Sequence, residues 1–139
     1  MTHPAGSAPV DLVHLADADG HFIVRIAGEP SPLTRHDSVR AEALASASFV
    51  DARLDLWLFL GQLDEWEAGL CELVPGRAAQ IDTGRGLGFT LHLHDNGWAT
   101  VSLLDPERIT LGLGFRVEDG WVEDHLDRLE QVRRFWAGT

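Results

Sequence analysis

GFTLHLHDNGWATVSLL, residues 88–104, decides the fold, because it contains two β-strands whose apolar positions fix how they pair. Apolar and polar residues alternate on each side of the turn signal Asp-Asn-Gly, which predicts a hairpin with one buried face. Residues directly opposite in an antiparallel pair share a face. A two-residue turn would set Leu93 opposite Thr100, whereas a three-residue loop sets Leu93 opposite Ala99. We therefore predict the three-residue loop, with Gly97 in the left-handed conformation that such loops need.

The same register places His92 and His94 on one face of the sheet, because they are two residues apart on a strand. Two imidazoles at this spacing are either half of a metal site or polar side chains that face water. Their expected neighbours across the hairpin are Thr100 and Trp98, and neither is a good metal ligand. Zinc needs three or four converging donors, and the hairpin supplies two. The sequence therefore favours a polar sheet face, with a metal or catalytic site as the alternative.

The next strand, about residues 109–117, has apolar residues on one face and Thr, Gly, Gly and Arg on the other. If Leu103 pairs with Ile109, Trp98 lies opposite Gly114. An aromatic side chain over glycine stabilises a weak point in a sheet. The alternative is a shallow binding surface, whose members would be Trp98, His92, His94 and Arg116.

Two further hairpins are predicted earlier in the chain. The runs VDLVHLA and HFIVRIAG flank Asp-Ala-Asp-Gly, which indicates a turn, because a calcium loop needs a later glycine and a closing glutamate. After a polar loop at 29–38, the runs at 39–49 and 53–60 also alternate. Pairing Phe49 with Leu54 sets small alanines opposite leucines. The alanine-rich run is also compatible with a helix by propensity, but the register favours a strand.

Two segments change to the helical period. Residues 62–74 and 120–136 carry apolar side chains at intervals of three and four, with acids on the opposite side. The side chains expected to be buried are Leu63, Trp66, Leu70, Leu73 and Val74 in the first helix and Trp121, Val122, Leu126, Leu129, Val132 and Trp136 in the second. Cys71 is expected on the buried side, as a small unreactive hydrophobe rather than a nucleophile. A short strand at about 78–83 follows the first helix.

A chain of 139 residues, 45% of them hydrophobic, has the size of one domain with its own core. We expect a flexible N-terminal tail at 1–9 and a single α+β domain at 10–139. This domain should contain about eight mostly antiparallel strands, in one sheet or two, and two amphipathic helices. Residues 84–88, Gly-Arg-Gly-Leu-Gly, should connect two strands, because no helix follows them to hold a phosphate.

The formal net charge of −11 argues against nucleic acid as a partner, because this field repels phosphate backbones. All basic residues are arginines, and there is no lysine. The acids gather on the two predicted helices. They form either solvated helix faces or an acidic surface that docks a basic protein partner. The acids expected to make such contacts are Asp64, Glu67, Asp124 and Asp127.

The remaining expectations concern location and assembly. The N-terminus lacks the basic start and apolar run of a signal peptide, and no stretch has the roughly 20 apolar residues of a membrane span. The single cysteine forms no internal disulfide. These features predict a cytoplasmic protein without a membrane or cofactor partner, as a monomer or homodimer.

Three segments together resemble a known family. They are DLVHLADADG (11–20), HDSVRAEALASASFVDARLDLWLFLGQLDEWEAGLCEL (36–73) and GWVEDHLDRLEQVRRFW (120–136). They resemble an actinobacterial, Streptomyces-type family defined as a domain of unknown function. In the order of its elements the chain is also distantly similar to WapI-type immunity proteins. Neither resemblance supplies catalytic residues.

Two functions are consistent with this sequence. No Gly-x-Ser-x-Gly, His-Glu-x-x-His or Cys-x-x-Cys motif occurs, so we expect no catalytic residues and no metal ligands. The favoured function is a non-catalytic acidic binding protein, of an immunity-like kind, that binds a basic protein. The alternative is a small metal- or ligand-binding enzyme that uses the face of His92 and His94.

Overall fold

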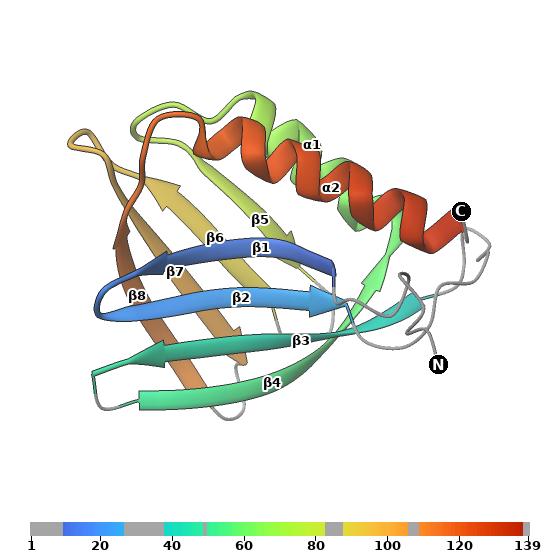
Figure 1. The fold of residues 1–139 in the computed structure, drawn as a ribbon, viewed down its shortest axis with the longest axis horizontal. Coiled ribbons are helices and arrows are strands. Elements are labelled where there is room, and N and C mark those ends of the chain that lie inside the picture. The colour runs from blue at the N-terminus through green and yellow to red at the C-terminus, as the bar shows by residue number, and fades with distance from the viewer. Residues whose placement is uncertain (1–9, 27–37, 49, 83–87, 106–108, 138–139) are drawn as a thin grey trace, which may run out of the picture.

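Two four-stranded antiparallel sheets make up most of the protein (Figure 1). The computed structural model describes residues 10–26, 38–48, 50–82, 88–105 and 109–137. The first sheet has the order β1 (Val10–Asp17), β2 (Gly20–Ile26), β3 (Ser38–Ala47), β4 (Val50–Phe59), and the second has β5 (Ala78–Asp82), β6 (Gly88–Leu93), β7 (Trp98–Asp105), β8 (Ile109–Arg116). Helix α1 is Leu60–Cys71 and helix α2 is Trp121–Ala137. The predicted α+β fold is confirmed.

Some predictions fall on parts of the chain outside the described residues. These are the flexible tail at 1–9, nearly all of the loop at 29–38 and most of the connection at 84–88. Within the described ranges, no helix is long and apolar enough to cross a membrane.

The order of elements repeats: four antiparallel strands and a helix, twice. Each helix packs against the first strand of the other half, α1 against β5 and α2 against β1. In Figure 1 the two helices lie side by side over one side of both sheets. The helices thus pack on the edge strands β1 and β5, while β4 and β8 form the opposite edges. The amino-acid sequence shows no such repeat. The same topology requires only a similar pattern of buried and exposed positions, which different residues can provide.

Helix α1 comes unusually close to β5. A Cβ atom added to Gly69 would lie 2.9 Å from the Cβ of Ala79 and 3.0 Å from its Cα. The core residues Leu63, Trp66 and Leu70 are buried as predicted. Small residues at both positions let the helix approach the strand closely enough to bury them.

Two predictions for α1 are wrong. Val74 is 54% exposed, because the helix ends at Cys71 and Val74 is no longer on the helical face. Cys71 is exposed rather than buried. Residues three or four positions apart lie on the same side of a helix. Cys71 is four positions after Glu67, which is three after Asp64, so Cys71 shares the polar side with these two acids. In α2, Leu129 and Val132 are buried, and the side chain of Trp136 lies outside the described part of the chain.

The hairpin of β6 and β7 has the predicted register. Leu93 pairs with Ala99, and His92 pairs with Thr100. The backbone N–H of His94 donates to the carbonyl of Trp98 at 2.8 Å, which closes a three-residue loop. Gly97 has the predicted left-handed conformation, with φ of 76°. Asp17 also makes the predicted turn between β1 and β2, because its Oδ1 accepts the N–H groups at positions 19 and 20.

Two predicted registers are wrong by an even number of residues. Leu54 pairs with Ala43, not with Phe49, which is outside the described residues. The run at 39–49 is a strand rather than a helix, as favoured. Leu103 pairs with Leu111 instead of Ile109. A two-residue period fits any even shift equally well, so the pattern set the face of each residue but not its partner.

The predicted contact between Trp98 and Gly114 forms even though the predicted register of β7 and β8 was wrong. Trp98 pairs with Arg116, and Thr100 pairs with Gly114. The indole nevertheless lies over Gly114, because a Cβ added there would be 2.6 Å from Trp98 Cζ2. A diagonal neighbour is within reach of a side chain of this size. The prediction of an aromatic side chain over glycine is therefore confirmed.

Candidate functional site

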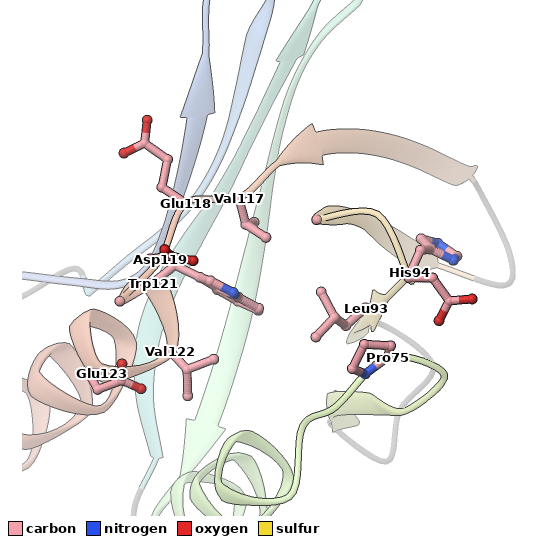
Figure 2. A pocket seen from close by; sticks show the side chains of 12 residues that line it. Pro75, Leu93, His94, Val117, Glu118, Asp119, Trp121, Val122 and Glu123 are labelled. Carbon is pink, nitrogen blue, oxygen red and sulfur yellow. The ribbon is translucent and has the colours of Figure 1, made fainter.

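A pocket of about 260 Å³ lies where three connections meet (Figure 2). They are the β6–β7 loop, the segment between α1 and β5, and the segment between β8 and α2 together with the first turn of α2. The residues around the pocket are Pro75, Leu93, His94, Asp95, Gly97, Val117, Glu118, Asp119, Gly120, Trp121, Val122 and Glu123.

Part of the pocket wall is apolar. Figure 2 shows Trp121, Val117 and Val122 on one side, and Leu93 with Pro75 on the other. All but Pro75 are half-buried side chains that pack against the hydrophobic core. Polar surface makes up about half of the lining.

Four acidic side chains surround this apolar lining. They are Asp95, Glu118, Asp119 and Glu123, and all are exposed. Within the residues that the structure describes, no arginine or histidine forms an ion pair with any of them. Carboxylates without a counter-charge attract cations. The pocket therefore combines an apolar wall, an indole and uncompensated negative charge.

Backbone hydrogen bonds hold the three connections together. The N–H of Gly76 donates to the carbonyl of Leu93 at 2.8 Å, and the N–H of Leu93 donates to that of Arg77 at 3.0 Å. The N–H of Val117 donates to the carbonyl of Gly97 at 2.8 Å. The backbone φ angles of three glycines, Gly76, Gly97 and Gly120, lie between 76° and 91°, a conformation that residues other than glycine rarely adopt. The glycines allow the turns, and the hydrogen bonds then fix the walls of the pocket.

His125 supports Trp121 from inside the protein, and the sequence analysis missed it. Its side chain is 1% exposed. Its Nδ1 lies 2.8 Å from the carbonyl of Trp121, and its Nε2 accepts the backbone N–H of His14 on β1 at 3.1 Å. The two rings meet edge to face, with centroids 5.7 Å apart. The sequence spacing could have predicted the burial of His125, because positions 121, 125, 129 and 132 fall on one stripe of α2 that faces the core.

These contacts define the protonation state of His125. Nε2 accepts a hydrogen bond, so the proton of the neutral ring is on Nδ1 and is donated to the Trp121 carbonyl. Burial lowers the pKa of His125 below its ordinary value of 6.5; the Trp121 carbonyl and Asp124 act in the opposite direction, and Arg128 and His14 add to the lowering. The neutral imidazole therefore joins the first turn of α2 to β1.

The predicted sheet-face residues do not come together at this pocket. Arg116 lies over the indole of Trp98, 5.7 Å from the ring centroid, and His92 is exposed opposite Thr100. Only His94 lines the pocket, and its Nε2 is 2.9 Å from Thr100 Oγ1. In the described ranges, no group of three or more His, Cys, Asp or Glu side chains is placed to hold a metal ion.

Of the four acidic residues that were expected to contact a partner, three form ion pairs within the protein. Arg133 NH2 lies 2.8 Å from Asp64 and 3.0 Å from Glu67, which ties α2 to α1. Asp124 pairs with Arg128 at 2.9 Å. Asp127 is exposed. None of the four lines the pocket, whose acids come from the β8–α2 segment with the first turn of α2 and, for Asp95, from the β6–β7 loop.

The fold is α+β, and its pocket combines apolar side chains with four acidic ones. The chain matches the family of unknown function DUF5959 over residues 10–137, and it belongs to that family. No match was found among curated proteins or among solved structures.

Proposed function

We propose that this protein is a non-catalytic binding protein whose pocket receives a cationic group, an arginine or lysine side chain, from a basic protein partner. The observation that carries the proposal is the set of four carboxylates that line the pocket without an ion-pair partner among the described residues. A guanidinium there meets carboxylates at the rim and the face of Trp121, which attracts cations. Its aliphatic stem packs against Leu93 and Val117.

The size of the pocket supports a single side chain. At about 260 Å³ it is smaller than the roughly 300–1,000 Å³ that is common for drug-sized ligands. The net charge of −11 would speed the approach of a basic protein through long-range attraction. Specificity then comes from the pocket, and association rate from the whole surface.

The finer features of this proposal come from the sequence. The distant similarity to WapI-type immunity proteins suggests that the basic partner is a toxin, whose exposed cationic residue the pocket would cover. The Streptomyces-type resemblance suggests an actinobacterial origin, and a cytoplasmic location is part of the same proposal.

A peptide experiment tests the pocket. The probe is a short peptide with one arginine, compared with the same peptide containing citrulline, which has nearly the same shape but no charge. Amide and indole NMR shifts of the ¹⁵N-labelled protein should move at Gly97, Gly120 and Trp121 with the arginine peptide only. Equal shifts with both peptides would contradict cation recognition.

Two sets of neutralising substitutions separate the pocket from the helix faces. The pocket set is Asp95→Asn, Glu118→Gln, Asp119→Asn and Glu123→Gln. The matched control set is Asp64→Asn, Glu67→Gln, Asp124→Asn and Asp127→Asn, which changes the net charge by the same amount. The pocket set should abolish the arginine-dependent shifts, and the control set should preserve them. The reverse result would move the binding surface to the helix faces.

The alternative function, a metal- or ligand-binding enzyme on the His92 and His94 face, is supported by the position of His94 beside the pocket. Elemental analysis of the purified protein tests it. A stoichiometric metal that is lost in a His92→Ala, His94→Ala variant would favour the enzyme over the binding protein. Loss of peptide shifts in that variant, without any metal, would instead assign His94 to the pocket.

A further inference from the structure

Strand β4 has no neighbouring strand on its outer side among the described residues. It is the last strand of its sheet, and ten residues, Val50–Phe59, pair with β3 on one side. Among the backbone hydrogen bonds made outside the sheets by the described residues, none involves β4. In Figure 1 it forms the lower border of the front sheet, away from both helices along most of its length. Open edges present unpaired N–H and C=O groups to other strands.

The outer face of β4 carries two large aromatic side chains in contact with water. Trp57 is 53% exposed and Phe59 is 39% exposed. They alternate with buried residues such as Leu56 and Leu58, as expected for a strand with one core face. Exposed aromatic side chains at a free edge are typical of an interaction surface.

A row of charged side chains crosses the same face of the sheet, from β1 to β4, and its last member, on β4, has no oppositely charged partner in the described part of the chain. Asp11 pairs with Arg25, Arg25 pairs with Glu42, and Glu42 pairs with Asp55. The signs are negative, positive, negative and negative. Like charges directly opposite each other destabilise a sheet. Arg53 forms an ion pair with Glu42, whereas Asp55 has no cation partner within the described residues. A strand added beside β4 would complete the row if it placed a cation opposite Asp55.

We propose that the added strand is β4 of a second copy of this chain, antiparallel and centred on Leu54. This register sets Arg53 of each copy opposite Asp55 of the other, so the charge row is completed twice. It also keeps core faces together, with Ala52 opposite Leu56. Shifting the centre to position 55 sets Asp55 opposite itself, and shifting it to position 53 sets Arg53 opposite itself. Among these three registers, charge favours the one centred on Leu54.

The same register covers the exposed tryptophan. Trp57 comes opposite Asp51 of the second copy and diagonal to its Arg53. Diagonal neighbours are within reach of aromatic and long side chains, and an arginine over an indole is favourable. The dimer has one continuous eight-stranded sheet. It leaves both pockets accessible, because no pocket residue is on β4.

Sedimentation velocity at several protein concentrations tests this dimer. Wild type should pass from monomer to dimer as its concentration rises. Asp55→Arg should weaken dimerisation by about tenfold or more, because two pairs of arginines then face each other across the interface. This variant should keep its fold, since the introduced arginine comes opposite Glu42 within the monomer, and thermal unfolding checks that it does.

The double exchange Arg53→Asp, Asp55→Arg should restore the dimer, because each introduced aspartate then faces an introduced arginine of the other copy. Asp19→Arg, at the turn between β1 and β2, is the matched control and should dimerise like wild type. A wild type that is monomeric at every concentration overturns the proposal. So does an Asp55→Arg variant that dimerises normally, or a double exchange that stays monomeric.

Discussion

The clearest energetic prediction concerns His125, which joins α2 to β1. Replacing it by leucine removes the acceptor for the backbone N–H of His14 and leaves a partly buried donor without a partner. Such a group costs about 1–3 kcal/mol. Replacing it by glutamine should cost less, because the side-chain oxygen of glutamine can reach the position of Nε2. Leucine should therefore lower the free energy of unfolding by about 1–3 kcal/mol, and more than glutamine does.

The pH dependence has a definite sign. Burial lowers the pKa of folded His125 below 6.5, so between that pKa and 6.5 the unfolded chain binds a proton that the folded chain does not. Stability rises with pH wherever the unfolded state binds more protons. The contribution of His125 is therefore intact above about pH 6.5 and is lost as pH falls toward the folded pKa, by at most about 1.4 kcal/mol per pH unit.

Urea unfolding from about pH 7.5 to about pH 5.5 measures this effect. The quantity is the difference in unfolding free energy between wild type and His125→Gln, because the other histidines are common to both. This difference should shift in favour of the glutamine variant as pH falls. A difference that is constant over this range would show that His125 is not held neutral in the folded protein. Because His125 touches Trp121, we expect arginine-peptide binding by wild type to weaken over the same range.

Three further substitutions test the packing. Leu70→Ala should lower the unfolding free energy by about 2–5 kcal/mol in chemical denaturation, because Leu70 is 1% exposed; a loss under about 1 kcal/mol would mean that α1 does not pack as described. Gly69→Ala should destabilise by about 1–3 kcal/mol despite alanine's better helix propensity, because its Cβ would lie 2.9 Å from that of Ala79; a stabilised variant would show that α1 can move away from β5 freely. Arg133→Ala should cost about 1 kcal/mol or less, since its pairs with Asp64 and Glu67 are partly exposed; the same loss in high salt as in low salt would contradict an ionic origin.

The sequence alone determined the elements and the face of most residues in them. Alternation over β6 and β7, together with the parity argument for the loop, predicted the pairing of Leu93 with Ala99. The helical period located α1 and α2 and most of their buried residues. These features are local, because the side-chain direction of a residue follows from its position within one strand or helix. The overall α+β class follows from counting such elements.

Only the tertiary structure decided which elements meet. Shifts by an even number of residues leave every side chain on the same face, so alternation could not distinguish the pairing of Leu54 with Ala43 from its pairing with Phe49. The separation of the strands into two sheets depends on the packing of the whole core, and so does the packing of each helix against the first strand of the other half. The acidic pocket was hidden for the same reason: its walls come from three connections that are distant in sequence and adjacent only after the sheets and helices have packed.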